Sequence, residues 1–159
     1  MANTHLLTPS ERQSWLALTG MLTRLPAALD AQLTKDAGLT FFEYMVLATL
    51  AEEPDRTLRM SVLAGRASGS LSRLSHVVRR LEAQGLVRRE GVPEDRRATN
   101  AILTPEGLSR VEAAAPRHLE FARSLVLDGA ADEDLDALGR LGSRVLEQLA
   151  PPHREAAAG

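Results

Sequence analysis

The sequence has no cysteine, a single lysine among 19 basic residues, and an aromatic content of only 3%. Without cysteine the chain has no disulfide, no thiolate zinc site and no thiol redox switch, which is typical of a reducing compartment. Long apolar runs are also missing, and none approaches the roughly 18 residues that a membrane-spanning helix needs. Residues 1–7 lack the basic and apolar regions of a signal peptide. We therefore expect a cytoplasmic protein without a membrane span.

The 159 residues are enough for one domain with its own hydrophobic core, and we predict a single domain over 1–159. The net charge of −2 argues by itself against nucleic-acid binding. The charge is unevenly distributed, however, because Arg56 to Arg97 holds ten arginines and four acidic residues, a net +6 against −8 elsewhere. Such a segment is typical of a localised nucleic-acid interface, and a solvated arginine-rich surface is equally compatible with it.

The N-terminal part of the chain has the pattern of one long helix. Thr8-Pro9-Ser10-Glu11 resembles a capping box with proline in the first turn, and leucines then recur at three- and four-residue steps until Gly38. We predict a helix within residues 8–37, with a bend rather than a break at Pro26 because the stripe keeps its phase.

The C-terminal part carries two further apolar stripes. One follows the helix start at Thr104-Pro105-Glu106, with a bend expected at Pro116, and the other follows Asp132 or Asp134 as the cap. We predict that these helices lie within 105–150. Together with the N-terminal helix they expose more apolar surface than one small lobe can cover, so we expect a homodimer in which a second copy buries them.

The middle of the chain, residues 40–104, has the proportions of a winged helix-turn-helix. Thr40-Phe41-Phe42-Glu43 is a second capping box that opens a helix. A very short strand at 57–58 and a short helix at 59–66 follow, with Val62 and Leu63 facing inward. The fold class predicted is therefore mainly α, with a small β-hairpin wing and flanking dimerisation helices.

The next predicted helix runs from Ser70 to Gln84, with Gly85 at its end, and has two opposed sides. Four apolar residues share one side at about 100° per residue: Leu71, Leu74, Val78 and Leu81. The candidate DNA contacts of this helix are Ser70, Ser72, Arg73, His76, Arg79 and Arg80. Arginine can donate two hydrogen bonds to guanine, and serine and histidine can also donate, so the first four residues suit base reading.

Arg79 and Arg80 lie further along this helix, where contact with DNA phosphates is favoured over base reading. The alternative for both is an ion pair with Glu82 or with a neighbouring helix. The sequence leaves both possibilities open.

Residues 86–90 and 97–103 are predicted strands, joined by a turn at 91–95. Asp95 and Arg97 are two residues apart, so in extended backbone they project to the same side, and the carboxylate can brace the guanidinium. A pre-oriented arginine on a narrow hairpin suits the negative potential of the DNA minor groove. An ordinary surface ion pair is the alternative.

The run from Asp95 to Thr104 fits the pattern D-x-R-x-x-x-x-x-L-T, and in this respect the chain resembles the multiple-antibiotic-resistance regulators, the MarR family. Arg80-Leu81-Glu82, Gly85-Leu86-Val87 and Thr104-Pro105-Glu106-Gly107 extend the resemblance, which covers nearly the whole chain. It implies a homodimeric winged helix-turn-helix transcriptional regulator, a ligand-responsive repressor of a near-palindromic DNA operator. It also adds Asp95, Arg96 and Arg97 to the candidate DNA contacts.

Two departures from the family limit what the resemblance implies. Arg73 and His76 stand where relatives often have serine and arginine, so the base preference does not transfer. The missing cysteine excludes the peroxide-sensing branch. Relatives often bind small aromatic or phenolic anions, and the candidate effector residues here are Arg12, Trp15, Phe42, Tyr44 and His118, each of which is also compatible with a core or surface role.

Two other functions compete with a DNA-binding regulator. An enzyme is disfavoured, because there is no Walker A loop, Rossmann fingerprint or H-E-x-x-H motif, and the four histidines are too scattered for a metal site. We expect neither a metal nor a cofactor. A winged-helix protein-interaction module or antirepressor remains the alternative, although such a module has no need of an arginine-bearing helix side.

Overall fold

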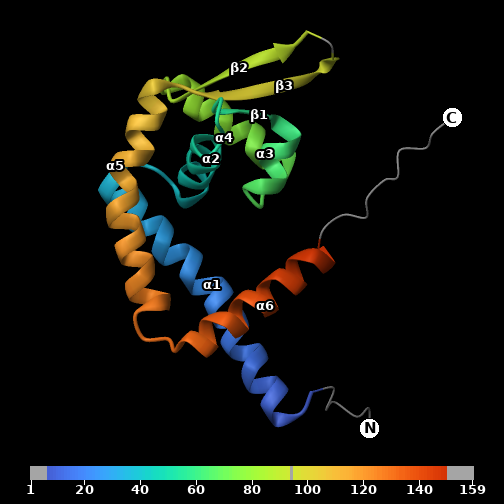
Figure 1. Cartoon of the computed structure of the whole chain (residues 1–159), viewed down its shortest axis with the longest axis vertical. Helices are drawn as coiled ribbons and strands as arrows, with labels where there is room; N and C mark the ends of the chain where they lie inside the picture. Colours follow the sequence, from blue (N-terminus) through green and yellow to red (C-terminus); the bar gives the residue numbers. More distant parts are fainter. Residues whose placement is uncertain (1–6, 94, 150–159) are drawn as a thin grey trace, which may run out of the picture. The chain divides into compact units, whose positions relative to one another are not determined.

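A computed structural model describes residues 7–93 and 95–149, except for the side chain of Arg96 (Figure 1). The chain divides into two compact units, Met1–Leu119 and Glu120–Gly159. The first unit holds a long helix, a winged helix-turn-helix and most of a second long helix. The second holds the last helix, and no described helix is long and apolar enough to cross a membrane.

The first helix, α1, spans Pro9–Ala37 and confirms the predicted capping box. The Thr8 hydroxyl accepts a hydrogen bond from the Glu11 amide at 3.3 Å, and the Glu11 carboxylate accepts one from the Thr8 amide at 2.7 Å. The helix continues through Pro26 and ends where Gly38 adopts the left-handed conformation, φ 65°. Helix α2, Phe41–Ala51, begins with the second predicted capping box, formed by Thr40 and Glu43.

The winged part begins with β1 (Thr57–Arg59) and α3 (Met60–Arg66), followed by α4 (Leu71–Ala83). Strands β2 (Val87–Val92) and β3 (Asp95–Leu103) form the wing, in an antiparallel sheet of order β1-β3-β2. Both wing strands are longer than predicted, because Gly91 pairs with Thr99 and Val92 with Asp95 across a register shift. The predicted turn at 91–95 therefore lies largely within the ladder.

The core of the first unit lies among α2, α3, α4 and the sheet. Leu47, Leu63 and Leu81 are among its fully buried side chains, and the inner side of α4 that the sequence predicted is confirmed by Leu74 and Val78. Two predictions about inward-facing residues were wrong. Val62 is 46% exposed, because α3 turns Met60, Leu63 and Ala64 inward instead, and Leu71 is 51% exposed because it lies at the first, outer turn of α4.

Helix α5, Pro105–Ala122, begins in close contact with the end of α4. The Thr104 hydroxyl donates to the Gly85 carbonyl at 2.7 Å and accepts from the Gly107 amide at 3.0 Å. A Cβ atom at Gly107 would collide with the Leu86 carbonyl oxygen, so only glycine allows this approach. The helix runs through Pro116 and continues as a π-helical turn, η1, over Arg123–Leu127.

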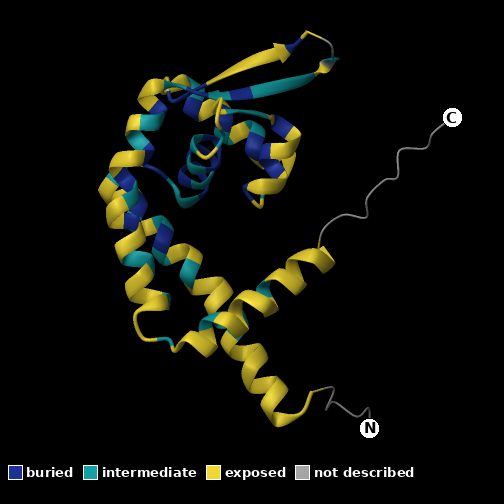
Figure 2. Ribbon diagram, viewed as in Figure 1, coloured by how far each residue is buried: buried dark blue, intermediate teal, exposed yellow. Residues whose placement is uncertain are grey.

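The last helix, α6, spans Asp132–Leu149 in the second unit. Asp132 is its first residue rather than its cap, and Asp134 accepts a hydrogen bond from the Ala131 amide at 3.4 Å. None of residues 132–149, all of which are described, is buried (Figure 2). Among the leucines of α6, Leu146 is 63% exposed and Leu149 is 74% exposed.

Candidate nucleic-acid interface

Helix α4 presents a polar, cationic side to solvent, opposite the side that is buried in the core. The exposed residues include five candidate contacts of α4 and its cap: Ser70, Ser72, Arg73, His76 and Arg79. Ser70 also caps the helix, because its hydroxyl accepts a hydrogen bond from the Arg73 amide at 3.2 Å. The hydroxyl hydrogen remains available as a donor.

Arg73 does not extend freely into solvent. Its guanidinium carbon lies 4.1 Å from the centre of the Phe42 ring, a cation–π distance. Phe42 is 7% exposed and belongs to the core, where its ring contacts α4, and its role in an effector pocket stays a prediction. The ring also lies against Gly69, where an added Cβ atom would collide with it, and the turn before α4 therefore depends on glycine at this position.

Arg80 makes the ion pair with a neighbouring helix that the sequence left open. Its Nε donates to Glu43 Oε1 at 2.5 Å, and the Glu43 side chain is only 2% exposed. The other Glu43 oxygen accepts from the Thr40 amide at 2.7 Å and from the Thr40 hydroxyl at 2.9 Å. A buried carboxylate with this set of donors has its charge compensated.

Glu82, the other suggested partner, pairs with the wing instead. It accepts hydrogen bonds from the Arg89 side chain at 2.9 Å and from the Arg89 amide at 3.0 Å. These bonds hold the pKa of Glu82 below its ordinary value. The pair joins the last turn of α4 to β2, and thereby the reading helix to the wing.

At the wing, Asp95 does not brace the guanidinium of Arg97 as predicted. One Asp95 oxygen accepts the backbone N–H of Arg97 at 3.1 Å, and the other lies 3.8 Å from Nη1 of Arg59. A short carboxylate reaches the amide two residues ahead more easily than the end of a long side chain, which explains the difference. Arg96 is a candidate contact whose side chain lies outside the described residues.

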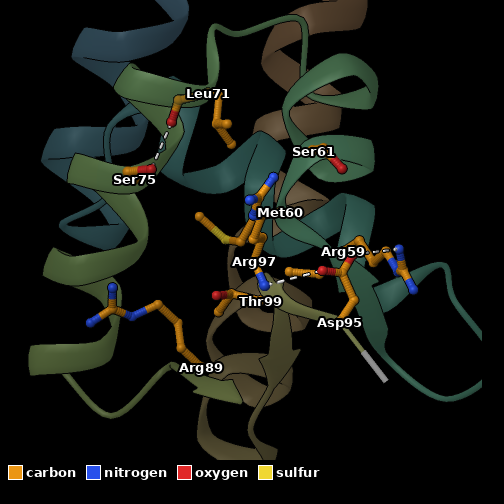
Figure 3. A pocket seen from close by; sticks show the side chains of 10 residues that line it. Arg59, Met60, Ser61, Leu71, Ser75, Arg89, Asp95, Arg97 and Thr99 are labelled. Atoms are coloured by element: carbon orange, nitrogen blue, oxygen red, sulfur yellow. Dashed lines mark hydrogen bonds and ion pairs between the residues drawn. The ribbon is translucent and has the colours of Figure 1, made fainter. Parts of the chain in front are cut away.

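The wing, α3 and α4 enclose a hollow of about 360 Å³ (Figure 3). The Arg97 side chain lies in this hollow near Met60, with Leu71 of α4 above it (Figure 3). Arg59 and Arg89 also line it, so three arginines from β1, β2 and β3 surround one concavity. Neither Arg59 nor Arg89 is among the DNA contacts predicted from the sequence. The available signal was their position at the start of the predicted helix 59–66 and within the predicted wing strand 86–90.

The structure brings together two of the five candidate effector residues. The rings of Tyr44 and His118 are 4.5 Å apart, and both side chains are buried. Burial raises the pKa of Tyr44, with the charge of Glu52 adding to the effect, and burial lowers the pKa of His118. His118 Nδ1 lies 3.0 Å from Oε1 of Gln32.

The remaining candidates lie elsewhere. Trp15 is 56% exposed and Arg12 is exposed, both in the first half of α1. Trp15 is 17 residues before Gln32, roughly 25 Å along the helix axis. Within one chain these two residues therefore do not share a site with His118.

A sequence model of the MarR family matches residues 37–98. The fold matches a crystal structure of Sco3205, a MarR family transcriptional regulator from Streptomyces coelicolor in complex with DNA, at a TM-score of 0.89 and 42% identity over 94% of both chains. AbsC, a MarR family transcriptional regulator from the same organism, gives 0.85 and 36% identity over 92% of this chain and 98% of its own. The repressor YetL of Bacillus subtilis is 28% identical over 112 residues, which span 70% of this chain and 66% of YetL.

Proposed function

The chain belongs to the MarR family of transcriptional regulators, and we propose that it binds a near-palindromic DNA operator as a homodimer and acts as a ligand-responsive repressor in the cytoplasm. The observation that carries the proposal is the exposed, cationic side of α4 beside the arginine-lined wing. Residues 40–104 form the DNA-binding lobe in this proposal, and residues 8–37 and 105–150 form the dimerisation helices.

In the proposed complex, α4 enters the major groove with its N-terminal half. Arg73 donates two hydrogen bonds to a guanine, and Ser70, Ser72 and His76 donate to neighbouring bases or phosphates. Arg79 and Arg80 hold the DNA backbone. Arg80 uses its Nε for Glu43, and an arginine has four further N–H donors for a phosphate.

The wing supplies the flanking contacts. We propose that Arg97 leaves its hollow to enter the minor groove, where the negative potential attracts a guanidinium, and that Arg96 contacts the adjacent backbone. The hydrogen bond from the Arg97 backbone N–H to the Asp95 carboxylate keeps the hairpin in place while the Arg97 side chain moves. Arg59, paired with the same Asp95, adds positive charge near this path.

The homodimer is supported by apolar residues that each unit leaves exposed. On α1 these include Trp15, Leu16 and Leu22, with exposures of 56% or more, and on α6 they include Leu141 and Leu146. Burying apolar surface of this kind contributes about 25 cal/mol for each Å². A second copy covers both sets under a two-fold axis and spaces the two reading helices about one DNA turn apart.

The proposed effector is a small aromatic or phenolic anion. Tyr44 and His118 are already packed against each other, so such a ligand needs the contact between α2 and α5 to open. Arg12 and Trp15 can join this site only from the partner copy. Thermal unfolding with 4-hydroxyphenylacetate or salicylate as the probe tests this site. We expect the probe to raise the Tm of the wild type and to leave the Tm of His118→Asn unchanged.

The test of DNA binding is a mobility-shift titration with duplexes that the wild-type protein selects from source-genome fragments. We expect affinity to fall steeply with salt, because neutralised phosphates release counterions. Arg73→Ala should cost about 1–3 kcal/mol of specific binding, and Arg97→Ala should also weaken it, with the dimer intact in both. Wild-type affinity for the operator in both variants would disprove the assigned contacts.

A further inference from the structure

We propose that the first turn of α2 positions the arginines of α4 for DNA recognition, although it does not itself contact DNA. Phe42 holds the guanidinium of Arg73, and Glu43 holds that of Arg80. Both are positioning residues that act through an arginine. The inference rests on the proposed function, and it adds to it two residues of a different helix.

The Phe42 ring is fixed from more than one direction. It is 7% exposed, and Gly69 lies so close to it that no side chain fits between the turn and the ring. The Arg73 guanidinium lies over the ring, 4.1 Å from its centre. Because the ring cannot shift without displacing the turn before α4, the arginine above it has a defined position.

Glu43 connects the interior of the lobe to the exposed side of α4. Its carboxylate is 2% exposed and receives three hydrogen bonds, two from Thr40 and one from the Nε of Arg80. The Arg80 side chain is 55% exposed, so a buried group anchors an arginine that otherwise lies in solvent. The anchor is charged and hydrogen-bonded on both oxygens, which makes it directional.

The spacing of the two α2 residues and the two α4 arginines allows one helix turn to position both arginines. Arg73 and Arg80 are seven residues apart on α4, and therefore lie on one side, two turns from each other. Phe42 and Glu43 are consecutive in α2. The first turn of α2 is held to α1, because the Phe41 amide donates to Asp30 Oδ1 at 2.8 Å.

Positioning affects binding because an arginine with many rotamers loses that freedom when it reaches DNA. Immobilising such a side chain at an interface weakens binding by about two- to tenfold. An arginine that is already held in the free protein avoids much of this loss. Phe42→Leu acts through Arg73, which reads bases, and should therefore weaken specific binding more than binding to random duplex, whereas a general loss of stability lowers both alike. Glu43→Gln acts through Arg80, which holds the DNA backbone, and should weaken binding to selected and random duplexes by similar factors.

The experiment is a pair of double-mutant cycles in the full-length protein, using a duplex that the wild type selects from a random-sequence pool. Phe42→Leu is combined with Arg73→Ala, and Glu43→Gln with Arg80→Ala. We expect Phe42→Leu alone to weaken specific binding by about two- to fivefold, the size of one cation–π contact. Glu43→Gln alone should weaken it by about two- to tenfold, the cost of immobilising one arginine side chain. In the background that lacks its arginine, the same substitution should have no further effect.

The matched control combines Phe42→Leu with Arg97→Ala, since Arg97 lies in the wing hollow rather than on the Phe42 ring. The two losses of binding affinity should be independent, so that the fold-changes multiply in the double variant. If Phe42→Leu fails to fold by circular dichroism, the cycle of Glu43 with Arg80 still decides the matter. Glutamine retains an oxygen that can accept from the Thr40 amide, so this variant keeps the cap.

The inference would be overturned if the free-energy effects were additive in both arginine cycles, or if Phe42→Leu weakened binding to selected and random duplexes equally. Failure of the proposed function gives a different result. In that case the wild type shows no salt-dependent preference for any duplex, and the selection itself returns no enriched sequence.

Discussion

The winged lobe (residues 40–104) and helix α6 use the same residue type, leucine at helical spacing, with opposite outcomes. In the lobe, Leu47, Leu63 and Leu81 are fully buried within their own chain. Helix α6 has no buried residue (Figure 2), and its Leu141 and Leu146 are 48% and 63% exposed. An apolar stripe therefore shows that a helix has a face to bury, and does not show whether the same chain or a second copy buries it.

The largest expected effect contrasts a leucine of each region. Leu81→Ala removes a fully buried side chain of α4 and should lower the free energy of unfolding by about 2–5 kcal/mol, because a cavity remains. Leu146→Ala, at 63% exposure, should have a small effect at protein concentrations where only monomer exists. Urea denaturation measured at several protein concentrations checks both. If both variants lost the same free energy of unfolding at every protein concentration, the contrast between the winged lobe and α6 would be contradicted.

A smaller effect is expected where α5 begins. Gly107→Ala places a Cβ atom against the Leu86 carbonyl and should cost about 1–3 kcal/mol, the range for overpacking. Gly65→Ala in α3 is the matched control, because its added Cβ meets no atom within 4 Å beyond its chain neighbours and the backbone of its own helix. That variant should be slightly stabilised, since alanine favours helix more than glycine does. Thermal unfolding distinguishes them, and similar Tm values would show that the junction is loosely packed.

Dimerisation of the exposed stripes provides the next test. Leu146→Ala should weaken the dimer by roughly 1–2 kcal/mol, because two copies each lose part of a buried leucine. Glu147→Gln, on the neighbouring exposed position, is the control and should leave the dissociation constant unchanged. Sedimentation equilibrium gives both constants. A dimer that tolerates Leu146→Ala would place its interface away from this side of α6.

The smallest expected effect concerns pH. Burial lowers the pKa of His118 from its ordinary value of 6.5, so the unfolded chain binds the proton more readily. Stability should therefore fall as the pH drops below about 6.5 and passes toward the folded pKa. The pKa values of Glu82 and Asp36 are also lowered, by hydrogen bonds from Arg89 and from Gln32 and Arg117 respectively, and their stabilisation is lost only at lower pH.

His118→Asn tests this assignment, because its amide can donate to Gln32 in place of Nδ1 and does not titrate. The decline in the free energy of unfolding between about pH 7 and about pH 5 should become shallower in this variant. Urea denaturation at each pH provides the measurement. An unchanged slope would assign the decline to other groups.

Local sequence signals predicted most of the fold. Capping boxes at Thr8 and Thr40 depend on residues three positions apart, and both helices begin where these patterns stand. Wing boundaries were predicted less well, because the ladder around Gly91 and Val92 depends on pairing with β3 rather than on local turn residues. Val62 was assigned to the wrong side, since a seven-residue helix contains too few turns to define its phase.

In the candidate site, too, the features set by local sequence were predicted and those set by distant residues were not. Exposure of Arg73 and His76 opposite Leu74 and Val78 was predictable, because helical periodicity alone sets which residues share a side. The Glu43–Arg80 pair joins residues 37 apart, and no local pattern predicts it. Nor does spacing show that Asp95 accepts an amide hydrogen and pairs with Arg59.

The sequence by itself determined the order of helices and strands, the cationic side of α4 and the excess of apolar stripe, since these depend on neighbours within a few residues. Only the tertiary structure decided how the arginines are held. Arg73 lies on Phe42, Arg80 on Glu43, and Arg97 in the hollow between wing and helices. A long, flexible side chain has many rotamers, and the one that it adopts is set by groups distant in sequence that folding brings within reach.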